Sequence, residues 1–242
     1  MKQNTAYLVD FDGTVTTEDL SSRLAAYYGG DKYLAIDKEY RQRNIPIKVW
    51  LQRIAQQLPA DFDMLMTKAL EWAKIRPGFE QFLEKAGKEA CPVVIASDGF
   101  GFYIEPILKK LGLFDSISYI YKNELIQASD GLQVVNTHAH QNCPECGNCK
   151  AAHVVRLKED GRSVIYIGDG SNDRFGASWS DHICARDSLA LHCAENNFNY
   201  SQWIDFYDII KVEKPGISDR SVTALCQPMG EGVRQPDKGE VF

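Results

Sequence analysis

Three short runs of apolar residues recur along the chain, and each ends at a small or acidic residue. They are residues 7–9 before Asp10, residues 92–96 before Ser97, and residues 163–167 before Gly168. Continuous apolar runs of this length are typical of parallel strands that are covered on both faces. A glycine-containing turn and a helix-like stretch follow each run, so the pattern predicts a doubly wound α/β sheet. In such sheets, ligands bind at the carboxyl ends of the strands.

Between the first two predicted strands, the apolar positions have the periodicity of helices. They repeat at i, i+3, i+4 and i+7 in two stretches: Ile47, Trp50, Leu51, Ile54 and Leu58, and then Phe62, Leu65, Met66, Ala69 and Ala73. We therefore expect a small helical cap domain over residues 16–76, inserted after the first strand of a core domain formed by residues 1–15 and 77–214. An insertion at this end of the sheet is well placed to act as a lid.

Two further segments complete the expected organisation. Residues 117–126 and 132–135 are predicted to be strands of a hairpin, because Ser129, Asp130 and Gly131 between them form a turn signal. Residues 215–242 have few apolar positions and no periodicity, so we expect a C-terminal tail.

Composition and charge exclude several classes of protein. The 242 residues are 44% hydrophobic and 25% charged, as in ordinary globular proteins, and the formal net charge of −6 disfavours general binding to nucleic acid or anionic membranes. No apolar run approaches the ~18–20 residues of a membrane span, and the N-terminus lacks a signal-peptide core. The seven cysteines are an odd number, which argues against a disulfide framework. We therefore expect a cytoplasmic protein.

A pair of carboxylates follows the first predicted strand. Asp10 and Asp12 are two residues apart, so both can face one cleft where the strand ends. Two like charges held close together need a cation or a shared proton, and Mg²⁺ prefers carboxylate oxygens together with water and substrate phosphate. The alternative is a strand-to-helix turn in which Thr14 or Thr16 caps the helix.

A second acidic pair follows the third predicted strand, in the segment GDGSND at residues 168–173. Asp169 would complete a carboxylate metal site with Asp10. Asp173 would orient a metal-bound water or a cation. The alternative for this segment alone is a glycine-rich turn with Asp173 as a helix N-terminal charge.

Two more segments are candidates for binding phosphate. Ser97, Asp98 and Gly99 follow the second predicted strand, where a hydroxyl and backbone N–H groups would form a phosphate cradle at a helix N-terminus. Lys150 would be the cation that compensates a phosphoryl oxygen. Serine and glycine are also ordinary turn residues, and a single lysine is commonly a solvated surface residue.

In this order, the four segments resemble the motifs of the haloacid dehalogenase (HAD) superfamily of phosphohydrolases. The family's DxDGT motif matches residues 10–14, its strand-ending Ser or Thr matches Ser97, its lysine matches Lys150, and its GDGxND motif matches residues 168–173. The resemblance covers about residues 5–212. The helical insertion looks like the small cap of the phosphoserine phosphatase-like branch.

Within that branch, the chain is most similar to the methionine-salvage phosphatases that act on 2-hydroxy-3-keto-5-methylthiopentenyl-1-phosphate. Four features carry this likeness: the segments at residues 75–79, 184–187 and 203–207, and the cysteines directly before Lys150. Phosphocholine and phosphoethanolamine phosphatases also carry cysteines before that lysine, so the likeness leaves the substrate open.

The resemblance implies a mechanism with an aspartyl-phosphate intermediate. Asp10 would attack phosphorus, and Asp12 would protonate the leaving oxygen and then activate water. Mg²⁺ would lie between the Asp10 carboxylate, the Asp12 backbone carbonyl and Asp169. Ser97 and Lys150 would hold phosphoryl oxygens, with Asp173 positioning Lys150 or a metal-bound water.

One residue of the predicted cap bears on specificity. Asp19 stands where phosphoserine phosphatases carry a glutamate that contacts the substrate ammonium, and this shorter acid puts phosphoserine in doubt. The alternative is a helix N-terminal charge.

The three cysteines of the segment CPECGNC, at residues 143–149, have a spacing that binds zinc in other proteins. Cys143, Cys146 and Cys149, with His140 as a fourth ligand, would form a structural zinc site that fixes the loop before Lys150. The alternatives are free thiols in a tight loop and a single labile disulfide.

The combined expectation is a Mg²⁺-dependent phosphatase of a small phosphorylated metabolite, working as a monomer or a homodimer. Hydrolysis of phosphoserine, phosphocholine or phosphoethanolamine is an alternative within the same class. A phosphotransferase would use the same residues. Outside enzymes, the alternative is an inactive HAD scaffold that senses a ligand or a metal through the cysteine cluster.

Overall fold

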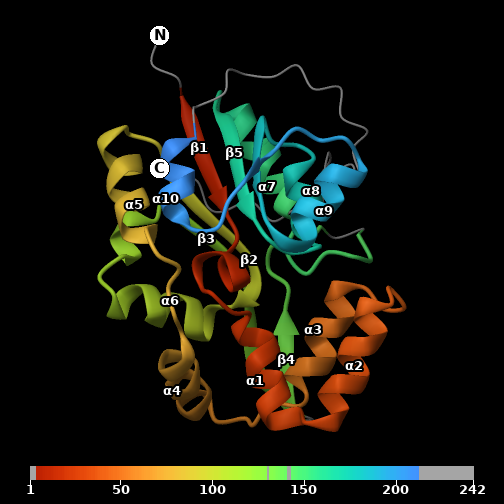
Figure 1. The fold of residues 1–242 in the computed structure, drawn as a ribbon. Helices are drawn as coiled ribbons and strands as arrows, with labels where there is room; N and C mark the ends of the chain where they lie inside the picture. Colours follow the sequence, from red (N-terminus) through yellow and green to blue (C-terminus); the bar gives the residue numbers. More distant parts are fainter. Residues whose placement is uncertain (1–3, 130, 141–142, 213–242) are drawn as a thin grey trace.

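A central sheet of seven strands divides the protein into two layers of helices in the computed structural model (Figure 1). The structure describes residues 4–129, 131–140 and 143–212. The strand order is β4-β3-β2-β1-β5-β6-β7, and neighbouring strands are parallel except for β3 and β4. The strands are β1 (Thr5–Val9), β2 (Val93–Phe100), β3 (Tyr119–Ala128), β4 (Gly131–Val135), β5 (Ser163–Gly168), β6 (His182–Ala185) and β7 (Ser201–Gln202). The predicted doubly wound α/β sheet is confirmed.

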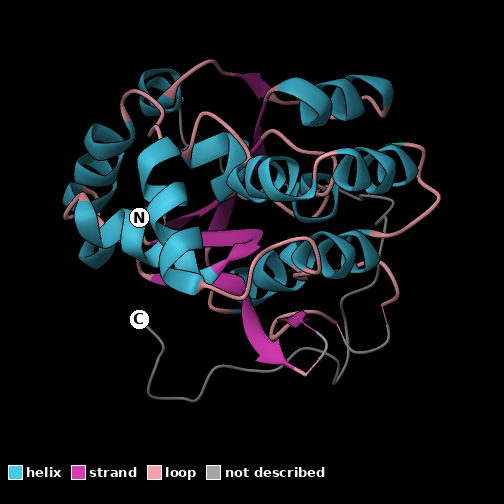
Figure 2. Cartoon of the chain, turned by 90° about the horizontal axis from the view of Figure 1, so that it is seen from below, coloured by secondary structure: helices cyan, strands magenta, loops and turns pink. Residues whose placement is uncertain are grey.

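The side chains of β1 alternate between two hydrophobic clusters, one on each face of the sheet. Tyr7 and Val9 pack on the side of α5 (Phe79–Lys88), α6 (Gly101–Lys110) and α10 (Phe206–Lys211). Ala6 and Leu8 pack on the side of α7 (Lys150–Glu159), α8 (Asp173–Ala177) and α9 (Asp187–Glu195). Figure 2 shows helices on both sides of the strands. Because both faces are covered, the central strands are apolar throughout, as their sequences predict.

Four helices lie between β1 and α5, as the periodicity of that segment predicts. They are α1 (Leu20–Gly29), α2 (Asp31–Arg41), α3 (Ile47–Ala55) and α4 (Phe62–Trp72). They lie at the end of the molecule toward which β1 points (Figure 1). The two connections to the sheet run side by side, because Thr16 and Ile75 form an antiparallel bridge and the Arg76 amide donates to the Val15 carbonyl at 2.8 Å.

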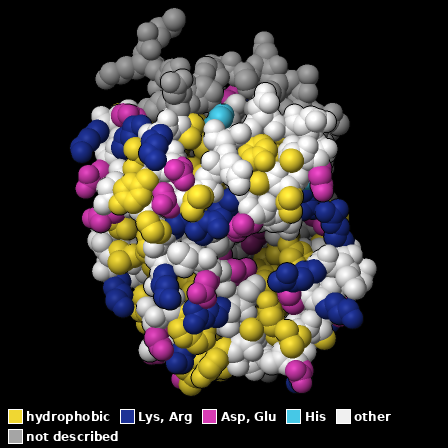
Figure 3. Space-filling view, in the orientation of Figure 1, with side chains coloured by type: hydrophobic (Ala, Val, Ile, Leu, Met, Phe, Trp, Pro, Cys, Tyr) yellow, Lys and Arg dark blue, Asp and Glu magenta, His cyan; other side chains and the backbone are white. Residues whose placement is uncertain are grey.

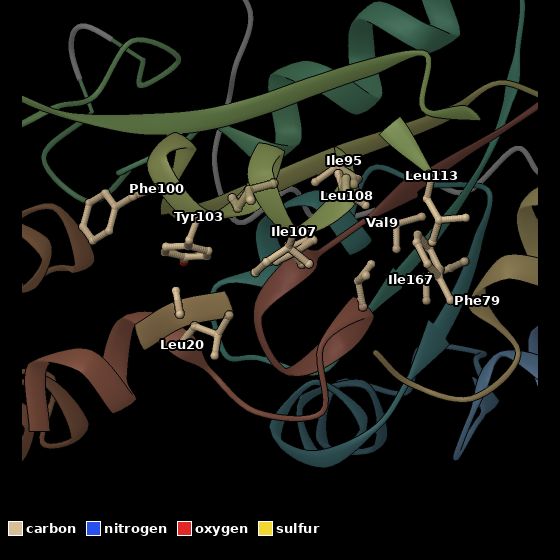
Figure 4. Close-up of a cluster of buried hydrophobic side chains, with 14 of the residues drawn as sticks. Val9, Leu20, Phe79, Ile95, Phe100, Tyr103, Ile107, Leu108, Leu113 and Ile167 are labelled. Carbon is tan, nitrogen blue, oxygen red and sulfur yellow. The ribbon is translucent and has the colours of Figure 1, made fainter. Parts of the chain in front are cut away.

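The buried cluster on the α6 face extends from the sheet to the inserted helices. Figure 4 shows Val9, Ile95 and Ile167 of the strands beside Ile107 and Leu108 of α6, and it shows Tyr103 facing Leu20 at the start of α1. All seven side chains are at most 2% exposed. The first helix of the insertion is therefore anchored in the same core as the sheet.

The predicted hairpin is confirmed, while the second strand is longer than predicted. β3 and β4 pair in antiparallel register, with Glu124 opposite Val135 and Ala128 opposite Gly131. β2 continues through residues 97–99 to Phe100, which pairs with Asn123 of β3 after a shift in register. A 3₁₀ turn, η2 (Phe114–Ser116), precedes β3. The predicted tail, residues 215–242, lies outside the described residues.

Candidate active site

Asp10 lies where β1 ends, and it forms a buried ion pair with Lys150. The Asp10 backbone amide donates to the Ile167 carbonyl of β5 at 2.9 Å, which fixes the residue at the edge of the sheet. Lys150 is the first residue of α7, and its Nζ lies 2.7 Å from Asp10 Oδ1 and 2.6 Å from Asp173 Oδ1. Burial would lower the pKa of Lys150, but the charges of Asp10 and Asp173 outweigh it and raise that pKa well above its ordinary value.

Asp169 completes a group of three carboxylates. One oxygen from each of Asp10, Asp169 and Asp173 lies within 4.8 Å of the other two, and this is the one such group of potential metal ligands in the described part of the chain. Burial first, and then the charge of Asp173, raise the pKa of Asp169 to about 7. Three ionised carboxylates and one ammonium would carry −3 + 1 = −2, a charge that suits a divalent cation.

The turn after β1 holds Asp169 in place. This turn, η1 (Phe11–Val15), lets Thr14 Oγ1 donate to Asp169 Oδ1 at 2.6 Å. Gly13 has a φ of 81°, and a Cβ there would collide with the Asp169 carboxylate. A residue without a side chain is therefore required at this position.

Asp12 lies beside the group of three, and its carboxylate bonds to the inserted helices and to α6. Its Oδ1 accepts the Leu20 backbone N–H at 3.0 Å, and its Oδ2 accepts a short hydrogen bond from Tyr103 Oη. Ser97 Oγ lies 3.5 Å from the same Oδ2. Burial first, and then the charge of Asp19, raise the pKa of Asp12 to about 8.

The position predicted for Ser97, Asp98 and Gly99 was wrong, although all three reach the site. They belong to β2 and not to the turn after it, because the strand continues to Phe100 and α6 begins only at Gly101. The Gly99 N–H donates to Ser97 Oγ at 2.9 Å and is not at a helix N-terminus. Burial raises the pKa of Asp98 to about 6.

Asp19 caps α1, in agreement with the structural alternative for this residue. Its carboxylate accepts the Ser22 N–H at 2.8 Å and the Ser22 Oγ–H at 2.9 Å. It also lines the cavity that contains Asp10 and Asp12. Asp19 can therefore have both of the roles considered for it, since a carboxylate that caps α1 and lines this cavity can also face a substrate.

The site lies at the base of a cavity of about 860 Å³ between the sheet and the inserted helices. The sheet side contributes the acidic group and Lys150, while α2, α3 and the loop between them contribute Tyr40, Arg43 and Trp50. Figure 3 shows the hollow, with acidic side chains in it and basic side chains at its rim. A cavity of this size is large enough for a small metabolite.

Three residues of the site carry no signal in the sequence. Tyr103 lies within α6 and bonds to Asp12, and Tyr166 of β5 donates to Asp173 Oδ1 at 2.6 Å. The Asn148 side chain donates to the Ser97 carbonyl at 2.8 Å and to the Tyr121 carbonyl at 2.9 Å, which ties the loop before Lys150 to β2 and β3. A tyrosine in an apolar segment reads as core, so sequence patterns do not single out these residues.

The predicted structural zinc site finds no support. Cys146 Sγ lies 3.2 Å from Cys143 Sγ, but the cysteines and His140 do not form a group of three ligands within 4.8 Å in the described residues. His153 of α7 is buried near this loop, with its Nε2 2.6 Å from Asn148 Oδ1.

The strand-end carboxylates, the lysine and the inserted helices are those expected of a haloacid dehalogenase-type hydrolase, and comparison with known families gives the same class. Residues 7–177 match the haloacid dehalogenase-like hydrolase family, and the chain belongs to this family. Curated relatives are named as phosphatases, and the chain is a phosphatase of this family.

Two curated relatives are similar over most of this chain. The 2-hydroxy-3-keto-5-methylthiopentenyl-1-phosphate phosphatase of Exiguobacterium sibiricum is 30% identical over 205 residues, covering 84% of this chain and 93% of that protein. The bifunctional enzyme MtnB/MtnX of Bacillus licheniformis is 29% identical over 208 residues, covering 85% of this chain and 48% of that enzyme. The expected likeness to methionine-salvage phosphatases is confirmed.

A solved structure confirms the fold. A phosphoserine phosphatase, solved as an analogue of its phospho-aspartyl intermediate, superposes with a TM-score of 0.68 at 20% identity, covering 87% of this chain and 99% of that chain.

In the described residues, no helix is both long and apolar enough to cross a membrane.

Proposed function

We propose that this protein is a Mg²⁺-dependent phosphomonoesterase that works through an aspartyl-phosphate on Asp10. The buried contact of Lys150 with both Asp10 and Asp173, next to Asp169, carries the proposal. A structural role alone does not account for two buried carboxylates, a half-buried third and a buried lysine beside one cavity, because each buried charge costs free energy.

Asp10 is the proposed nucleophile, and Lys150 keeps it ready for attack. The ion pair at 2.7 Å favours the ionised carboxylate and limits the directions in which it can point. It acts against burial and the charge of Asp173, which together raise the pKa of Asp10 well above its ordinary value, so a bound divalent cation would also be needed to hold the carboxylate in its charged form. Attack on phosphorus forms the Asp10–phosphoryl bond and breaks the bond to the leaving oxygen. Water then releases phosphate and regenerates the carboxylate.

Asp12 is the proposed general acid and base. With a pKa of about 8 in the absence of a metal, it holds a proton at neutral pH and can donate it to the leaving oxygen. Once ionised, it can accept a proton from the attacking water. The hydrogen bond from Tyr103 supports this second role, because it stabilises the charged carboxylate.

The donor set fits Mg²⁺. Hard carboxylate oxygens, in a group whose net charge with Lys150 would be −2, match a small divalent cation better than a thiolate-binding metal. Asp10, Asp169 and the Asp12 backbone carbonyl would hold the ion, with Asp173 beside them. When bound, the ion would neutralise charge on the phosphate oxygens. Ser97 and Lys150 would hold those oxygens from the protein side.

We propose 2-hydroxy-3-keto-5-methylthiopentenyl-1-phosphate as the substrate and methionine salvage in the cytoplasm as the setting. Support comes from the curated relatives, which carry that activity in their names at 27–30% identity over more than four fifths of this chain. The cavity wall contributed by α3 and the residue before it includes Pro46, Ile47, Trp50 and Leu51, and such apolar side chains suit a methylthio group.

We also propose that residues 16–76 act as a cap domain over a core of residues 1–15 and 77–214. The paired connections at Thr16 and Ile75 support this division, because both links leave the sheet at one place. A rotation there would move α2 and α3 relative to the acidic group and open the cavity.

A panel of phosphate esters tests the proposal. Phosphate release would be measured with and without Mg²⁺ on the methylthiopentenyl phosphate, phosphoserine, phosphocholine and phosphoethanolamine. We expect Mg²⁺-dependent release with the highest kcat/KM on the first compound. A higher kcat/KM on phosphoserine would overturn the substrate, and full activity in an Asp10→Asn variant would overturn the mechanism.

A further inference from the structure

The cysteine loop before α7 brings three thiols together, with Cys146 next to both Cys143 and the buried Cys149. Cys146 Sγ lies 3.2 Å from Cys143 Sγ, while a disulfide bond requires about 2.05 Å, so the two sulfurs need to approach by little more than 1 Å. The other described cysteines outside this loop, Cys91, Cys184 and Cys193, are buried at separate places in the sheet layers. Within the described residues, this loop is therefore the place where cysteines gather.

Solvent reaches Cys143 more readily than Cys146. Cys143 is half-buried, and Pro144 and Glu145 between the cysteines are exposed, whereas Cys146 is 6% exposed. A reagent can therefore reach Cys143 first, and Cys146 is then the nearest group that can resolve the product. This division between an accessible thiol and a shielded neighbour is typical of reversible redox pairs.

We propose that Cys143 and Cys146 form a reversible disulfide with low-molecular-weight disulfides such as oxidised glutathione. The Cys143 thiolate attacks one sulfur of glutathione disulfide, which forms a mixed disulfide and releases one glutathione thiol. Cys146 loses its proton to solvent and attacks the Cys143 sulfur, which releases the second glutathione thiol. The protein loses two electrons and two protons, and glutathione disulfide gains both.

The same loop supports the inserted helices. The Lys48 N–H at the start of α3 donates to the Glu145 carbonyl at 3.4 Å, and Glu145 lies between the two cysteines. A Cβ on Gly147 would lie 2.5 Å from Leu51 Cδ1 of α3 and 2.7 Å from Asp98 Oδ1 of β2, so the loop backbone is packed between the insertion and the sheet. There is little room for the loop to contract without changing its contact with α3.

Formation of the disulfide therefore acts on the cavity wall. Drawing the two sulfurs together moves the peptide that contains Glu145, and the long hydrogen bond to Lys48 is the contact most easily lost. Since α3 lines the cavity, we expect KM to rise about two- to tenfold, the range that corresponds to the loss of one hydrogen bond. Lys150 follows the loop as the first residue of α7. We expect it to keep its two ion pairs, so kcat should change less than KM.

Disulfide mapping and kinetics test the proposal on the full-length protein. The protein would be equilibrated with reduced and oxidised glutathione, digested after blocking of free thiols, and mapped by mass spectrometry, while kcat and KM for p-nitrophenyl phosphate are measured before and after reduction. We expect a Cys143–Cys146 bridge that forms and disappears reversibly, together with the rise in KM.

Variants in the same loop provide the controls. Cys143→Ser and Cys146→Ser should lose both the bridge and the response of KM, whereas Cys149→Ser should keep both. A Cys146–Cys149 bridge, no bridge at all, or near-stoichiometric zinc in protein purified without chelators would overturn the redox site. A bridge that leaves KM unchanged would overturn its coupling to α3.

Discussion

Replacing Tyr103 with phenylalanine should raise the pKa of Asp12. The phenol is buried, and its own pKa is raised well above the ordinary value by burial and by the charge of Asp12, so it stays protonated and donates to Asp12 Oδ2. This hydrogen bond stabilises the ionised carboxylate. Its removal destabilises the charged form, and the pKa must therefore move upward from about 8.

The size of the shift follows from the strength of the lost hydrogen bond. A hydrogen bond to a charged group contributes about 1.5–3 kcal/mol, and one pKa unit corresponds to about 1.4 kcal/mol. The expected shift is therefore about one to two units. Asp12 keeps the N–H of Leu20 at 3.0 Å, so the carboxylate remains in place.

The pH dependence of kcat/KM on p-nitrophenyl phosphate measures this shift. Asp12 must be protonated to donate to the leaving oxygen, so activity falls as the pH rises through its pKa. The alkaline limb should move to higher pH in Tyr103→Phe. Tyr166→Phe is the matched control, because it removes a buried hydroxyl from Asp173 and not from Asp12. A limb that stays in place or moves to lower pH in Tyr103→Phe would refute the assignment of Asp12.

Three further predictions concern metal binding, stability and the contact between the insertion and the sheet. Because burial raises the pKa of Asp169 to about 7, Mg²⁺ affinity measured by calorimetry should weaken about tenfold per pH unit below that value, and a pH-independent affinity would contradict the metal site. The pKa of Asp98 is raised from 3.8 to about 6, so the free energy of unfolding falls as the pH rises between these values. In urea unfolding at neutral pH, Asp98→Asn should therefore be more stable than the unchanged protein by no more than about 3 kcal/mol. This gain should vanish near pH 4. The Gln52 side chain of α3 accepts the Val134 N–H at 3.0 Å and donates to the Leu132 carbonyl at 3.4 Å. Gln52→Ala should therefore lower the free energy of unfolding by about 1–2 kcal/mol and raise KM. An unchanged KM would show that this contact does not affect substrate binding.

Local patterns in the sequence were sufficient to locate the acidic residues of the site. Asp10 and Asp169 each follow an apolar run, and adjacent parallel strands bring their carboxyl ends together, as the pairing of β1 with β5 does here. The helical insertion was predictable for a similar reason, since the spacing of apolar residues in α3 and α4 depends only on each helix.

Contacts between distant segments were not predictable in this way. Tyr103 reaches Asp12 across 91 positions, and Asn148 reaches Ser97 across 51, because helix and loop pack on the sheet in three dimensions. The extension of β2 to Phe100 was missed because Ser97 and Gly99 resemble a turn, whereas the pairs that Ala96 and Phe100 form with β3 hold both ends of this segment in the strand. Likewise, cysteine spacing does not distinguish a metal site from a pair of thiols.

Rapid quenching of a reaction with substrate labelled on phosphorus tests the central claim most directly. If Asp10 is the nucleophile, acid-quenched protein should carry label on the peptide that contains Asp10, in amounts that rise with Mg²⁺, and Asp10→Asn should carry none. Turnover at the full rate without label on that peptide, or label on another residue, would contradict the aspartyl-phosphate mechanism.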